Sequence, residues 1–133
     1  MKRIGKLLII CMSLALAGCQ QAAEKRIRAG FDIDPETKIT EEVIAAHVKA
    51  QLPIGTRKEV VLNRLRELEE GPLTGMSNPV VGVYPLDDEK KIVIRFEYGN
   101  SMRLVKEHYA VEFLFGETDL LEEVIPHVWL TGL

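Results

Sequence analysis

The stretches that decide the fold are residues 92–98 (IVIRFEY) and 109–115 (YAVEFLF), in which apolar residues recur at every second position. Successive side chains of a β-strand point to opposite faces, so this alternation predicts two strands that share one apolar face. On the other face, Arg95 and Glu112 are expected to form a cross-strand pair worth about 0.2–1 kcal/mol. The expected inward residues are Ile92, Ile94, Phe96, Tyr98, Tyr109, Val111, Phe113 and Phe115, and the expected outward residues are Val93, Arg95, Glu97, Ala110, Glu112 and Leu114.

Two further strands are predicted on either side of this pair. Residues 80–84 (VVGVY) form a short strand that ends at Pro85 and the turn Asp87-Asp88-Glu89. After the turn at residues 116–119 (GETD), residues 121–130 form a last extended segment. Because proline has no N–H to donate, Pro126 either restricts this segment to an edge position or breaks it in two.

Two helices are predicted before the strands. Residues 41–51 form the first, with Thr40 as its N-cap, and the second opens with a capping box made by Thr56 and Glu59. In the second helix Val61, Leu65 and Leu68 share one face. We therefore expect an α+β domain over residues 40–133, in the order α-α-β-β-β-β. The helix pair packs on one face of a three- to four-stranded antiparallel sheet, and the other face is exposed or binds a partner.

The N-terminus has the pattern of a bacterial export signal. Lys2, Arg3 and Lys6 precede an apolar run at residues 7–16, which spans about 15 Å as a helix against about 30 Å for a bilayer core. The following residues 16–19 (LAGC) resemble the lipobox of bacterial lipoproteins. The resemblance implies that cleavage between Gly18 and Cys19 removes residues 1–18. It also implies that Cys19 receives a diacylglycerol group and an N-acyl chain, which together anchor a protein stably.

Residues 19–39 are predicted to be the lipidated cysteine and a flexible tether, with a reach of about 25 Å. Ile27, Phe31 and Ile33 interrupt its polar character, and either pack on the edge of the domain or take part in docking. This arrangement places the chain in the cell envelope. In a cell with two membranes, Gln20 rather than aspartate after Cys19 favours the periplasmic side of the outer membrane.

Composition narrows the possible partners. The signal holds three of the 17 basic residues and none of the 20 acidic ones, so the mature 115 residues carry 14 basic against 20 acidic residues, a formal charge of −6. This balance argues against nucleic acid and against a polybasic membrane-binding surface. Cys11 is removed with the signal and Cys19 is acylated, so no disulfide or thiolate zinc site is expected in the domain.

Residues 52–56 (LPIGT), followed by Val60, Val61 and Leu65, resemble a pattern of small bacterial lipoproteins. The best-known bearer is the small lipoprotein component of the outer-membrane β-barrel assembly machinery. The resemblance implies an α+β domain in which Gly55 precedes the second helix and Val61 and Leu65 are buried. The chain departs from the family at residues 66–68 (REL), where the family has a Gly-x-Pro ending. A helix pair on a sheet also resembles the repeats of a β-lactamase-inhibitor protein.

Catalytic motifs are missing from the sequence. His47, His108 and His127 lack the spacing of a metal-binding pair, and neither G-x-S-x-G nor H-E-x-x-H occurs. We therefore expect a non-enzymatic accessory protein that binds another envelope protein, with no metal and no cofactor besides the acyl chains on Cys19. Acidic turns such as residues 87–89 leave calcium as a minor alternative.

The candidate partner-binding residues are Trp129, Leu114 and Phe31, because aromatic anchors dominate protein interfaces. We expect Trp129 to lie near Leu114, either closing the core or exposed on the outer face. Two other functions remain open. One is an inhibitor or immunity-type lipoprotein that blocks a secreted enzyme. The other is an envelope enzyme, which would need a deep pocket that brings His127 or His108 to a carboxylate.

Overall fold

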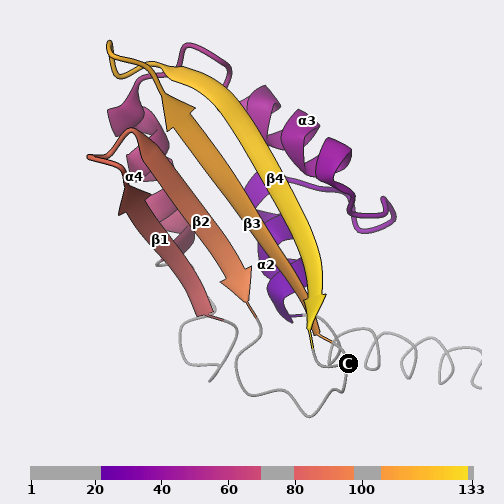
Figure 1. Cartoon of the computed structure of the whole chain (residues 1–133). Coiled ribbons are helices and arrows are strands. Elements are labelled where there is room, and N and C mark those ends of the chain that lie inside the picture. The colour runs from indigo at the N-terminus through magenta and orange to yellow at the C-terminus, as the bar shows by residue number, and fades with distance from the viewer. Residues whose placement is uncertain (1–21, 70–79, 98–105, 132–133) are drawn as a thin grey trace, which may run out of the picture.

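A computed structural model describes residues 22–69, 80–97 and 106–131 of the chain. These residues form three helices followed by four strands, arranged as a single antiparallel sheet in the order β1-β2-β3-β4. The helices lie together on one face of the sheet (Figure 1). The fold is therefore α+β, with helices before strands. Its elements are α2 (Ala22–Phe31), α3 (Glu41–Gln51), α4 (Lys58–Glu69), β1 (Val80–Leu86), β2 (Lys91–Glu97), β3 (Lys106–Phe115) and β4 (Leu121–Thr131).

The core lies between the helices and the inner face of the sheet. All the predicted inward residues of β2 and β3 within the described ranges are buried, which confirms the alternation; Tyr98 lies outside those ranges. They pack against Ile44 and Val48 of α3 and against Val61 and Leu65 of α4. These helix positions recur at intervals of four residues, so each helix presents one apolar stripe to the sheet.

Helix α2 differs from the expected tether. Residues 22–31 form a helix, and the side chains of Ala23, Ile27 and Phe31 are fully buried. The Phe31 ring meets the Phe96 ring edge-on, with centroids 6.1 Å apart. Burial of Ile27 and Phe31 is worth about 1.5–3 kcal/mol each, so the prediction of a flexible tether is wrong over α2. Ile33 and Ile39 after α2 are also buried, and the domain therefore begins well before residue 40.

Helix α2 runs antiparallel to α4, as two hydrogen bonds show. The Arg64 guanidinium donates to the Gly30 carbonyl (2.8 Å), and the Arg26 guanidinium donates to the Leu68 carbonyl (3.1 Å). Gly30 permits this approach, because a Cβ there would lie 3.0 Å from a methyl group of Leu68. Since α4 starts beside the hairpin turns, the N-terminus of α2 points to the opposite end of the sheet, its lower end in Figure 1.

The helix N-termini show one correct and one wrong prediction. Thr40 caps α3 by accepting a hydrogen bond from Val43 N (3.2 Å). Thr56 does not cap α4. Its hydroxyl donates to the Pro53 carbonyl, and its own carbonyl accepts from Leu121 N (2.8 Å). Pairing with the start of β4 holds this segment extended, so α4 begins only at Lys58. No helix within the described ranges is long and apolar enough to cross a bilayer.

Candidate functional site

The outer face of the sheet is the broadest candidate surface, because all the described helices lie on the other side (Figure 1). The strand register determines which side chains share it, since directly opposed residues point to the same face. Its residues are Gly82, Tyr84 and Leu86 on β1; Lys91, Val93, Arg95 and Glu97 on β2; His108, Ala110, Glu112 and Leu114 on β3; and Glu123, Ile125, His127 and Trp129 on β4.

A hollow of about 550 Å³ is lined mainly by residues of this face and reaches Val128 and Glu41 of α3 at the β4 edge. Its floor contains Val93 and Ala110, which are only 5% and 4% exposed although they face outward. Longer side chains around them form the walls, among them Leu86, Arg95 and Trp129. The hollow therefore combines an apolar floor with an aromatic and charged rim.

Tyr84 forms the β1 side of the face. Its ring lies over Gly82, because a Cβ built on that glycine would overlap the Tyr84 hydroxyl. The Arg95 guanidinium carbon lies 5.7 Å from the ring centroid, within the range of a cation–π contact. The aromatic side chain thus covers the glycine of an edge strand and remains 46% exposed. Tyr84 is a fixed, accessible aromatic group that the sequence reasoning did not select.

A polar network crosses three strands on the same face. The Glu112 carboxylate on β3 lies 2.9 Å from His127 Nε2 on β4 and 2.7 Å from Lys91 Nζ on β2. Hydrogen bonds from His127 and Lys91 hold the pKa of Glu112 below its ordinary value, and the same carboxylate raises the pKa of Lys91. The predicted Arg95–Glu112 pair does not form. Arg95 stands opposite Ala110 and instead approaches Glu97 at 3.7 Å.

The structure does not bring the three predicted partner-binding residues together. Trp129 stands opposite His108 near the lower end of the sheet, and the two rings stack with centroids 5.4 Å apart. Leu114 stands opposite Glu123 at the turn end, so the predicted proximity of Trp129 and Leu114 is wrong. The short turn at residues 116–120 pairs the end of β3 with the start of β4, which leaves Trp129 far along the strand. Phe31 is in the core and contributes nothing to the outer face.

Both edges of the sheet are partly occupied. On β1, Val83 N donates to the Glu69 carboxylate of α4 (2.9 Å), and Pro85 follows on the same edge without an N–H. On β4, Val128 N donates to the Glu41 carboxylate of α3 (3.3 Å), and Pro126 lies on that edge. Prolines and charged groups at sheet edges oppose pairing with another strand. A protein partner therefore has better access to the outer face than to either edge.

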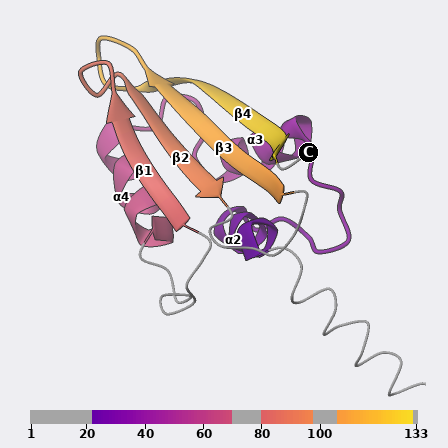
Figure 2. The same ribbon diagram turned by 60° about the horizontal axis from the view of Figure 1, so that its bottom comes forward.

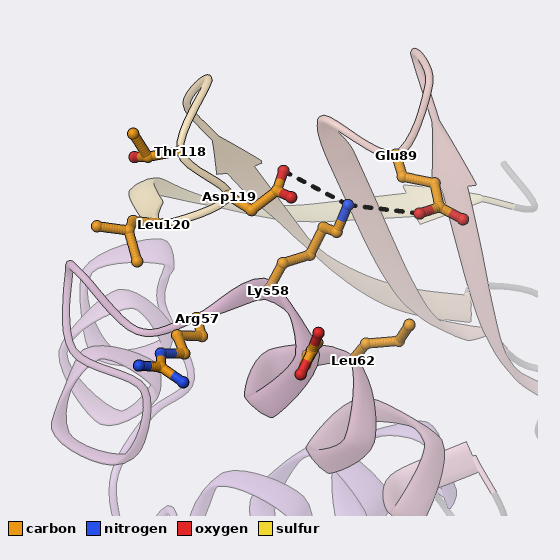
Figure 3. A pocket seen from close by; sticks show the side chains of 8 residues that line it. Arg57, Lys58, Leu62, Glu89, Thr118, Asp119 and Leu120 are labelled. Atoms are coloured by element: carbon orange, nitrogen blue, oxygen red, sulfur yellow. Dashed lines mark hydrogen bonds and ion pairs between the residues drawn. The ribbon is translucent and has the colours of Figure 1, made fainter.

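A second hollow of about 480 Å³ lies at the turn end (Figure 3). Lys58 Nζ stands 3.4 Å from the Glu89 carboxylate and 3.5 Å from that of Asp119. Lys58 thereby links the β1–β2 turn to the β3–β4 turn, as the dashed lines in Figure 3 show. The two carboxylates balance the positive charge of the lysine, so we interpret Lys58 as a structural link between the two hairpins. Across the described ranges, His, Cys, Asp and Glu side chains form no group of three that could hold a metal ion.

The histidine placement bears on catalysis. His127 meets a carboxylate, Glu112, inside the outer-face hollow, but the described lining supplies no serine, threonine or cysteine. His108 is buried under Trp129 with its Nε2 2.6 Å from the Thr131 hydroxyl, and His47 lies on α3.

Gly18 and Cys19, the predicted cleavage and lipidation residues, lie outside the described residues. No family model, curated protein or solved structure matches the chain.

Proposed function

We propose that this chain is a lipid-anchored accessory protein of the cell envelope, whose outer sheet face binds another envelope protein. One observation carries the binding role: the outer face presents a hollow with a buried apolar floor, while both sheet edges are partly occupied. The lipobox at residues 16–19 supports the anchor, since covalent acyl chains would hold the domain at a membrane.

The composition of the hollow indicates what kind of partner surface it fits. Val93 and Ala110 provide a floor that an apolar side chain of the partner would desolvate. Arg95 and Trp129 line the hollow, and Tyr84 lies on the same face under Arg95; these three residue types are enriched among interface hot spots. Lys91 and Glu112 contribute both signs of charge at the rim, which suits a polar periphery around an apolar contact.

Site-specific photocrosslinking in the intact envelope tests this proposal. A benzoyl-phenylalanine at Tyr84 probes the outer face, and one at Lys49, which is exposed on α3, probes the helix side as a matched control. We expect one discrete membrane-bound adduct from position 84 and none from position 49. Equal labelling at both positions, or none at either, contradicts a binding role for this face. A discrete adduct with a secreted enzyme supports the inhibitor function instead.

Filling the hollow provides a second test. Ala110→Phe places a large side chain on its floor, whereas Ala46→Phe adds the same group at an exposed position of α3. The Tyr84 adduct should disappear in Ala110→Phe and persist in Ala46→Phe, with both variants folded by circular dichroism. Persistence of the adduct in both variants places the contact elsewhere.

The lipid anchor is tested separately through Cys19→Ser. We expect the wild-type chain to incorporate labelled fatty acid and to float with membranes in a density gradient. The serine variant should neither incorporate the label nor float, because its hydroxyl group cannot form the thioether that joins Cys19 to the diacylglycerol group. Acyl labelling that survives the substitution overturns the assignment of Cys19.

A further inference from the structure

The distance between the proposed lipid anchor and the folded domain is very short. Only Gln20 and Gln21 separate Cys19 from α2, which begins at Ala22. Three successive Cα–Cα steps of about 3.8 Å place the Ala22 Cα within about 11 Å of the Cys19 Cα. If Cys19 carries its acyl chains in the bilayer, as the proposed function requires, the start of α2 lies at the level of the lipid headgroups.

Helix α2 cannot easily lengthen this connection. Ala23 and Ile27 are fully buried in its first two turns, and Phe31 packs against Phe96. The Arg26 guanidinium also holds the Leu68 carbonyl of α4. Unwinding α2 would expose these apolar side chains and break that bond. The domain is therefore held close to the membrane rather than carried on a tether.

The direction of α2 determines which part of the domain faces the lipid. Its N-terminus points to the lower end of the sheet, where β1 and β3 begin and β2 and β4 finish (Figure 2). Leu130 lies at this end and is 59% exposed, more than any other large hydrophobic residue that the structure describes. Trp129 is next to it and half-buried, and tryptophan favours the membrane–water interface.

We propose that the lower end of the sheet, with Leu130 and Trp129, contacts the lipid surface and stands the strands upright on the membrane. The outer face then opens sideways, parallel to the membrane plane, towards a partner in the same membrane. The turn end with Lys58 points away from the lipid. The mature charge of −6 supplies no electrostatic attraction to lipid, so the short connection and these apolar side chains determine the orientation.

Trp129 allows a direct test, because it is the only tryptophan in the chain. The full lipidated chain is reconstituted into phosphatidylethanolamine–phosphatidylglycerol vesicles containing phosphatidylcholine with a spin-labelled headgroup. We expect loss of Trp129 emission by contact quenching. A long Gly-Ser insertion between Gln21 and Ala22 should restore the emission. Leu130→Ser should weaken the quenching, and Leu120→Ser, at the turn end, should leave it unchanged.

Two probes and a flotation control separate this proposal from the anchor itself. Bimane on Leu130→Cys should be quenched more strongly than bimane on Thr118→Cys, since Thr118 lies in the turn-end hollow. Equal quenching of the two probes, or equal emission with and without the insertion, overturns the orientation while flotation still supports lipidation. Wild-type protein that fails to float overturns both proposals.

Discussion

Glu112 and His127 face each other on neighbouring strands, with the carboxylate oxygen 2.9 Å from Nε2, and Lys91 holds the other carboxylate oxygen at 2.7 Å. One side chain thus joins β2, β3 and β4 across the outer face. The Lys91 and His127 side chains are both held at the wall of the hollow by this carboxylate. The network therefore couples the shape of the proposed binding surface to the ionisation of a single group.

Acidification should weaken the fold through Glu112. Its pKa in the folded state lies below the unfolded value of about 4.3, because His127 and Lys91 hydrogen-bond to the carboxylate. The stabilisation is complete above about pH 4.3 and is lost as the pH falls through the folded pKa. In thermal unfolding, the melting temperature of the wild type should exceed that of Glu112→Gln at neutral pH, and this difference should shrink below about pH 4. Glu123→Gln is the matched control, and the same profile in that variant contradicts the assignment.

Helix α2 should behave as part of the core. Phe31→Ala removes a fully buried ring and should lower the free energy of unfolding by about 3–5 kcal/mol. Lys25→Ala, on the exposed side of the same helix, should change it by less than about 0.5 kcal/mol. Urea denaturation of the two variants measures both values. Similar, small effects from both would restore the view of this segment as a tether.

These two regions show how far sequence reasoning reached. The period-two alternation in β2 and β3 is a strong local signal, and it correctly predicted the sheet, its inner face and the helix side of the core. Helix α2 was missed because its buried residues Ala23, Ile27 and Phe31 recur every fourth position within a charged segment of only ten residues. The polar residues of this segment indicated a tether, and its helical spacing was given less weight. A helix this short is stable only because it packs against the rest of the domain.

The candidate surface was harder to predict for a different reason. Which outward residues meet depends on strand register, and the turn length at residues 116–120 sets that register. The expected register placed Trp129 near Leu114, whereas Trp129 stands opposite His108. It also paired Arg95 with Glu112, whereas Arg95 stands opposite Ala110. The covering of Gly82 by Tyr84 has no local signature beyond a Gly-x-Tyr spacing, and packing alone reveals it.

The Tyr84 ring should depend on the absence of a side chain at position 82. Gly82→Ala should displace the ring from the strand and break its contact with Arg95, at a cost of about 0.2–1 kcal/mol. The same change made in a Tyr84→Ala background should lose this cost, since no ring remains to displace. A double-mutant cycle of unfolding free energies measures the coupling. Additive effects in the cycle would show that the ring and the glycine are independent.

The occupied edges of the sheet should keep the domain from pairing with further strands. Glu69 covers the N–H of Val83 on β1, and Pro85 removes a second donor from that edge. Glu69→Ala combined with Pro85→Val leaves two donors uncovered in a β-branched strand, which is a template for strand addition. We expect concentration-dependent dimers or larger species by analytical ultracentrifugation.

The matched control is Glu67→Ala with Pro53→Val. It makes the same two changes at exposed positions away from the sheet edges and should leave the sedimentation behaviour of the wild type unchanged. If the edge variant also sediments like the wild type at high concentration, the carboxylate and the proline do not protect β1. Because β4 carries the same combination of Glu41, Val128 and Pro126, the corresponding change there should produce the same self-association.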